Sequence, residues 1–97
     1  MLIRVVRMHF SKSGVANFLT IFNANKHSIR HFNGCMHLEL LRDLSLPETY
    51  TTISHWQSED HLNAYRKSTL FETVWKDVKN HFAAHPEAFS LESIIEL

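Results

Sequence analysis

Two short segments of this chain each carry a histidine and a charged side chain two residues apart. Arg7 and His9 stand two residues apart near the N-terminus, and His37 and Glu39 show the same spacing further on. Residues two apart lie on one face of a strand, so each pair would present its groups together. A neutral histidine could take a proton from a bound acidic group, and a nearby arginine could stabilise the anion. The pattern makes His37, His9 and Arg7 the candidate catalytic residues, provided that their faces turn toward a binding site.

The same residues also allow a structural interpretation. Arg7 and His9 could each take part in a structural ion pair with an acidic residue, or lie at the edge of a sheet with the polar end of the side chain in solvent. His37 and Glu39 could join a cross-strand polar cluster with Arg7 or Thr52, since buried polar groups are normally hydrogen-bonded. From the sequence alone, both interpretations stay open.

Aromatic side chains supply candidate ligand contacts. Tyr65 and Trp75 fall in segments with helical spacing, whereas His55 and Trp56 end a segment rich in Thr and Ile. Flat rings stack on other flat rings, so we predict that these four residues bind substrate. The alternative for the aromatic residues is packing in the core, and for His55 a place inside a barrel or at an interface.

Two histidine pairs have a spacing that can hold a metal. His27 and His31 lie four residues apart, as do His81 and His85. The first pair falls away from the apolar stripe of its predicted helix, and Pro86 indicates that the second helix has already ended. A zinc site needs three or four converging ligands, so we predict no metal site.

Hydrophobic periodicity predicts four strands and two helical regions. The strands are expected over 2–10, 35–42, 50–56 and 89–97, and the helical regions over 15–31 and 59–82. Ser13 and Ser58 are the predicted N-caps of the helices, and Gly34 suits a left-handed exit from the first one. Lys67-Ser68-Thr69 weakens the second region, where we expect a break or kink.

The order β-α-β-β-α-β is the ferredoxin-like plan of an α+β domain, with a four-stranded antiparallel sheet and both helices on one face. At 97 residues, a single domain over 1–97 is expected. Apolar side chains share one face of each of the first two strands: Val6, Met8 and Phe10, and Met36, Leu38 and Leu40. They could pack beneath the helices, or they could form the uncovered face of the sheet. A second copy of the chain would then hide that face, and we predict a homodimer.

The overall composition restricts the partners. Ten basic and ten acidic residues give a net charge of zero, which favours neither nucleic acid nor an anionic membrane as a partner. No apolar run is long enough to span a bilayer, and arginines interrupt any signal-peptide core near the N-terminus. Cys35 is the only cysteine, so no internal disulfide can form. We expect a soluble, cytoplasmic protein.

Four local motifs accompany this plan: Phe32-Asn33-Gly34-Cys35, His37-Leu38-Glu39-Leu40-Leu41-Arg42-Asp43, Ser54-His55-Trp56-Gln57-Ser58 and Leu62-x-x-Tyr65-x-x-Ser68-x-x-Phe71. Together they resemble the antibiotic biosynthesis monooxygenase (ABM) domain family of the dimeric α/β-barrel superfamily. The resemblance implies two sheets that meet face to face in a dimeric α/β barrel, with a ligand cleft in each subunit between sheet and helices. Known members include cofactor-independent oxygenases of quinols or polycyclic aromatic phenols, and others have no established reaction.

A related branch degrades haem with an Asn, a Trp and an axial His. This chain has Arg7, Tyr65 and Trp75 at the aligned positions, and none of them matches. The resemblance therefore implies a monooxygenase that needs no cofactor and acts on a small aromatic or quinol-type molecule. The alternatives are a binding or sensing module that uses the cleft without turnover, and a structural dimerisation unit whose cleft is filled.

Overall fold

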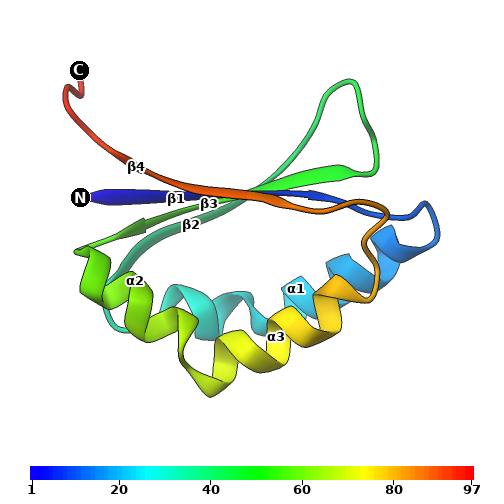
Figure 1. Cartoon of the computed structure of the whole chain (residues 1–97), viewed down its shortest axis with the longest axis horizontal. Helices are drawn as coiled ribbons and strands as arrows, with labels where there is room; N and C mark the ends of the chain where they lie inside the picture. The colour runs from blue at the N-terminus through cyan, green and yellow to red at the C-terminus, as the bar shows by residue number, and fades with distance from the viewer.

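Four strands and three helices make up the chain (Figure 1). The computed structural model describes all 97 residues. In chain order the elements are β1 (Leu2–His9), α1 (Gly14–Arg30), β2 (Cys35–Arg42), β3 (Thr49–Trp56), α2 (Glu59–Arg66), α3 (Thr69–Lys79) and β4 (Glu87–Glu92). None of the helices combines the length and the apolar character that a membrane crossing requires.

The strands form one sheet in the order β2-β3-β1-β4, in which every neighbouring pair is antiparallel. All the helices lie on the same side of this sheet (Figure 1). We refer to that side as the helix face and to the other side as the open face. The ferredoxin-like α+β arrangement expected from the sequence is confirmed.

Ser68 divides the second helical region into α2 and α3. Its hydroxyl donates a hydrogen bond to the Tyr65 carbonyl at 2.6 Å and accepts one from the Phe71 N–H at 3.1 Å. The serine therefore ends one helix and caps the next, and the predicted break is confirmed. Ser58 caps α2 in the same way, because its hydroxyl accepts a hydrogen bond from the His61 N–H at 3.2 Å.

Two details differ from the sequence-based expectation. Ser13 is the N-cap residue of α1, as predicted, but its side chain makes no capping hydrogen bond, and Ser11 instead accepts one from the Gly14 N–H at 3.1 Å. Strand β4 covers Glu87–Glu92 rather than 89–97. Glu92 pairs with Leu2 at the start of β1, so the residues after Glu92 have no neighbouring strand with which to form ladder hydrogen bonds.

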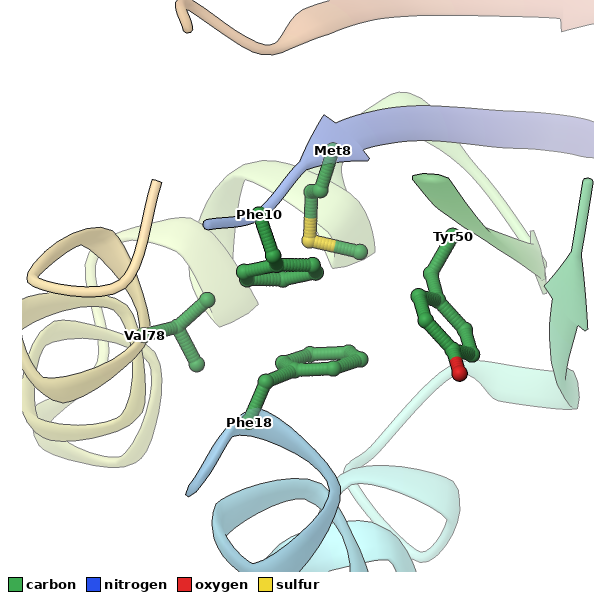
Figure 2. Close-up of a cluster of buried hydrophobic side chains, with 5 residues drawn as sticks. All are labelled: Met8, Phe10, Phe18, Tyr50 and Val78. Carbon is green, nitrogen blue, oxygen red and sulfur yellow. The ribbon is translucent and has the colours of Figure 1, made fainter. Parts of the chain in front are cut away.

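Two buried clusters join the helices to the sheet. The larger contains Met8, Phe10, Phe18, Tyr50 and Val78 (Figure 2). Within it the rings of Phe10 and Phe18 stack with their centroids 4.1 Å apart. The smaller cluster contains Cys35, Trp56 and Leu62. Each large apolar side chain buried in this way contributes about 1.5–3 kcal/mol to the stability of the fold. The two clusters hold the helices against the sheet at the two ends of the space between them.

The apolar residues considered for the uncovered face lie mainly under the helices. Those that pack there are Val6, Met8, Phe10, Leu38 and Leu40. Met36 differs, because it falls at an irregularity between Cys35 and His37 and is 45% exposed. Packing beneath the helices was therefore the correct alternative for this set, and a dimer through the open face would have to use other side chains.

Gly34 permits the tight connection between α1 and β2. Its φ is +90°, the only positive φ in the chain, and its carbonyl accepts a hydrogen bond of 2.9 Å from the Gln57 N–H. A Cβ at this position would lie 2.4 Å from the ring of His61. The left-handed exit predicted at Gly34 is confirmed, and the close approach of α2 is a second reason for glycine here.

Candidate functional site

A cavity of about 290 Å³ lies between the helix face of the sheet and the helices. Every strand and helix contributes to it, and 14 of the 18 lining residues are hydrophobic. Ligand pockets commonly measure about 300–1,000 Å³, so this one suits a small molecule of one or two rings. Two other depressions, beside Leu2 and Leu40, are shallow and open to solvent.

A row of four aromatic rings runs along the cavity. Trp56 stacks on Tyr65 with centroids 5.0 Å apart, Tyr65 meets the edge of Phe71 at 5.2 Å, and Phe71 lies parallel to Trp75 at 5.9 Å. All four residues line the cavity. Offset-stacked and edge-to-face arrangements are the favoured ones for such rings, so the row offers a preformed surface for a flat aromatic ligand.

Trp56 joins the core to this surface. Its side chain is fully buried, at 0% exposure, and its indole N–H donates a hydrogen bond of 2.9 Å to the Ser54 hydroxyl. Residues two apart on β3 share the helix face, so Ser54 also lines the cavity. The interaction satisfies the buried indole donor and fixes the ring that begins the aromatic row.

Four polar side chains interrupt the apolar lining: Arg4, Thr52, Ser54 and Arg66. The guanidinium of Arg4 donates a hydrogen bond of 3.1 Å to the Ser90 hydroxyl on β4. Partial burial lowers the pKa of Arg4 from its ordinary value, and repulsion from Arg66 lowers it further. The cavity is therefore apolar with a local concentration of positive charge.

Tyr65 contributes a neutral phenol to the same wall. Burial raises the pKa of this phenol well above its usual range, and the Cys35 sulfur adds to the effect. Because the phenol stays protonated, it can donate a hydrogen bond to a bound molecule. It is not suited to act as a base at neutral pH.

The predicted catalytic residues lie on the open face. Odd-numbered residues of β1, and those of β2 from His37 onward, point away from the helices, so His37, His9 and Arg7 do not line the cavity. His9 bonds Glu87 at 2.8 Å, Arg7 pairs with Asp43 at 3.5 Å and His37 pairs with Glu39 at 3.2 Å. The expectation that these residues reach the cleft was wrong, because it took the other face of each strand as the covered one.

The predicted substrate-binding residues divide in the same way. Trp56, Tyr65 and Trp75 line the cavity. His55 lies on the open face, where its ring is 4.7 Å from that of His37 on the neighbouring strand. The prediction that His55 contacts a ligand in the cavity is therefore wrong, because this side chain lies on the other side of the sheet.

The candidate metal ligands do not converge. No group of three or more His, Cys, Asp or Glu side chains in the chain is placed to hold an ion. The Nδ1 atom of His31 makes a hydrogen bond of 2.7 Å with the backbone carbonyl of His27. This nitrogen is therefore not directed at a metal ion shared with the His27 ring. Cys35 is buried, and burial raises the pKa of its thiol, with partial opposition from a backbone hydrogen bond at His37.

Sequence reasoning missed both arginines that line the cavity. The signal was present for Arg4, because it alternates with Val6 and Met8 on one face of β1. It was also present for Arg66, which lies four residues after the buried Leu62 and so on the same side of α2. An arginine that interrupts an apolar face is the pattern that could have identified them.

The fold is thus a ferredoxin-like α+β domain with a cavity, lined largely by aromatic and aliphatic side chains, between its sheet and its helices. Residues 1–77 match the antibiotic biosynthesis monooxygenase (ABM) family, and the chain belongs to this family. The resemblance noted in its motifs is thereby confirmed.

Solved structures share the fold over nearly the whole chain. A crystal structure of an antibiotic biosynthesis monooxygenase has a TM-score of 0.91 and 14% identity, covering 98% of this chain and 100% of that chain. A conserved protein from Methanosarcina mazei Go1 has a TM-score of 0.90 and 19% identity, covering 97% of this chain and 94% of its own. SnoaB, a cofactor-independent oxygenase from Streptomyces nogalater, has a TM-score of 0.87 and 17% identity, covering 99% and 95% respectively. No curated protein sequence matches the chain significantly. At these identities the likeness shows the fold.

Proposed function

We propose that this protein is a cofactor-independent monooxygenase that oxidises a small aromatic or quinol-type molecule in the cavity between sheet and helices. The row of rings formed by Trp56, Tyr65, Phe71 and Trp75 along an apolar cavity is the observation that carries the proposal. Membership of the ABM family supports the reaction class. SnoaB, which has the same fold, is a cofactor-independent oxygenase.

The reaction begins with ionisation of a ring hydroxyl on the substrate. The positive charge of Arg4 and Arg66 lowers the pKa of a phenol held in the cavity, and the proton leaves to solvent. The electron-rich anion then reduces O₂. For a quinol, one ring C–H becomes C–OH and the ring becomes the quinone, while O₂ supplies the new hydroxyl oxygen and one water. The quinol supplies all four electrons, so the balance needs no protein redox group. The apolar lining excludes water that would intercept reactive intermediates.

Oxygen uptake tests this proposal directly. An oxygen electrode would follow the folded protein with a panel of one-ring and two-ring hydroquinones. We expect uptake that depends on substrate, with one atom of ¹⁸O₂ in the product and the other in water. If the folded protein shows no uptake above the buffer rate with any member of the panel, the enzymatic proposal fails.

A binding or sensing module is the second candidate function. One observation favours it: no His, Asp or Glu side chain lines the cavity, so the site lacks a strong general base. Saturable binding of an aromatic ligand that is recovered unchanged under air would support this function over the first.

We also propose that two copies of the chain pair through their open faces. This face carries apolar side chains on all four strands: Ile3, Val5, Leu41, Ile53, Phe89 and Leu91. Phe89 is 46% exposed and Leu91 is 50% exposed, and contiguous apolar patches of this kind commonly mark an interface. Light scattering at micromolar concentration should give twice the mass of one chain, and a monomer would refute the pairing.

A further inference from the structure

Two arginines line the cavity without an acidic partner. The ion pairs in the chain are Arg7 with Asp43, His9 with Glu87 and His37 with Glu39. Arg4 makes one side-chain hydrogen bond, to Ser90, and the Arg66 side chain makes none. A guanidinium carries five N–H donors, so most of the donors on these two residues remain available to a ligand.

The two charges also oppose each other. Partial burial and repulsion from Arg66 both disfavour the charged form of Arg4. Arg4 is half-buried and Arg66 is exposed to solvent, so water screens part of this repulsion. An anion bound beside both guanidiniums would offset the repulsion that remains.

Ser54 adds a neutral donor beside Arg4. The two residues face each other across β1 and β3 in the strand register, and both line the cavity. The Ser54 oxygen already accepts the Trp56 indole N–H. The hydroxyl donates no hydrogen bond to another group of the chain, so its proton remains available to a ligand.

We propose that the molecule bound in this cavity is an aromatic ring system bearing an anionic oxygen group, and that Arg4 and Arg66 bind this group with the Ser54 hydroxyl. The rings lie along Trp56, Tyr65 and Trp75, and the charged group lies at the arginines. A guanidinium matches a carboxylate or an ionised ring oxygen by charge-assisted hydrogen bonds. The proposal deepens the proposed function and rests on the same cavity, but it concerns recognition rather than turnover.

Equilibrium binding of inert probes tests the inference separately from catalysis. Quenching of Trp56 and Trp75 fluorescence would report the affinity for 2-naphthoate and for its neutral match, 2-naphthamide. A second pair, 2-hydroxy-1,4-naphthoquinone with its ionised enol and neutral 1,4-naphthoquinone, represents an anionic ring oxygen. We expect the anion of at least one pair to bind on the order of tenfold more tightly, the size of a charged hydrogen bond. The pair that shows the preference identifies which anion the site takes.

Matched variants locate the preference. Arg4→Met and Arg66→Met should each remove most of the preference for the anion, whereas Arg4→Lys should keep part of it. Arg7→Met is the control on the open face of the same strand, and Lys67→Met is the control beside Arg66. Circular dichroism would establish that each variant is folded. Should Arg4→Met prove unfolded, Arg66→Met and Arg4→Lys still test the assignment.

Two results would overturn the inference. One is equal affinity for anion and neutral match in both pairs. The other is a preference that survives in Arg4→Met and Arg66→Met. Oxygen uptake with neutral quinols alongside either result would leave the monooxygenase proposal standing. Selective binding of anions without any uptake would support the inference and remove the proposed reaction.

Discussion

The indole N–H of Trp56 donates a 2.9 Å hydrogen bond to the hydroxyl of Ser54, two residues earlier on β3. Both side chains are buried, with 0% and 8% exposure respectively. One serine therefore satisfies a core donor and also lines the cavity. The buried core and the proposed ligand cavity meet at this pair.

Ser54→Ala should reduce the free energy of unfolding by about 1–3 kcal/mol, because it leaves the buried indole N–H without an acceptor. Urea denaturation followed by circular dichroism would measure the loss. Ser45→Ala, in an exposed loop, is the matched control and should stay within about 0.5 kcal/mol of the natural protein. Equal stability of Ser54→Ala and the control would show that the indole finds another acceptor.

Gly34→Ala should be among the most damaging single-methyl additions in the chain. A φ of +90° disfavours any Cβ, and the added atom would meet the His61 ring. We expect a loss of at least about 2 kcal/mol in the free energy of unfolding. The double variant Gly34→Ala/His61→Gly removes the His61 Cβ and ring atoms that the added Cβ would meet and leaves the backbone cost, so it should be less destabilised than the sum of the two single changes. Asn33→Ala, next to it and exposed, should have little effect.

Asp43 should make folding sensitive to acid. Backbone N–H groups of Leu46 and Ser45 lower the pKa of its carboxyl, and Arg7 contributes further. A carboxyl whose pKa is lower in the folded state than in the unfolded state stabilises the fold above the unfolded value of about 3.9. That contribution disappears as the pH falls through the lower, folded value.

Unfolding curves at a series of pH values would test this linkage. Asp43→Asn should be less stable than the natural protein near neutral pH, and the difference should shrink as the pH falls below about 3.9. Asp77→Asn removes a carboxylate that makes no hydrogen bond or ion pair and is the control. A difference for Asp43→Asn that stays constant with pH would argue against the assigned contacts.

Removing the open-face side chains should leave the chemistry intact. His37→Ala and Arg7→Met change groups that do not line the cavity. Loss of a general acid or base typically lowers the rate about 100-fold or more. Because these two residues lie outside the cavity, kcat/KM in the variants should stay within roughly threefold of the natural value. Light scattering on the same samples would separate any loss of pairing from a loss of chemistry. A drop of about 100-fold in a variant that keeps its oligomeric state would return these residues to the catalytic site.

The sequence predicted the fold well because its signals were local. Alternation, the Ser58 cap and the Ser68 break each depend on neighbouring residues, and β2 was predicted at Cys35–Arg42, the limits that the structure gives. The end of β4 was misplaced because it depends on where β1 begins, which is a property of the partner strand.

The site was harder to predict for a different reason. Alternation shows that Arg4 and Arg7 lie on opposite faces of β1, but it does not say which face the helices cover. Both faces carry apolar residues, so charged residues on either side were plausible. The same wrong choice of face applies to His37 and His55. The aromatic candidates Trp56, Tyr65 and Trp75, chosen for their ring type, do line the cavity.

The central claim, that an aromatic molecule is oxidised inside the cavity, is tested most directly by blocking that space. Ala88 lines the cavity from β4, so Ala88→Trp should fill it, whereas Phe89→Trp places the same side chain on the open face. With a quinol that the natural protein oxidises under ¹⁸O₂, we predict labelled product from the natural protein and from Phe89→Trp, and none above background from folded Ala88→Trp. Equal product from folded Ala88→Trp would contradict the account.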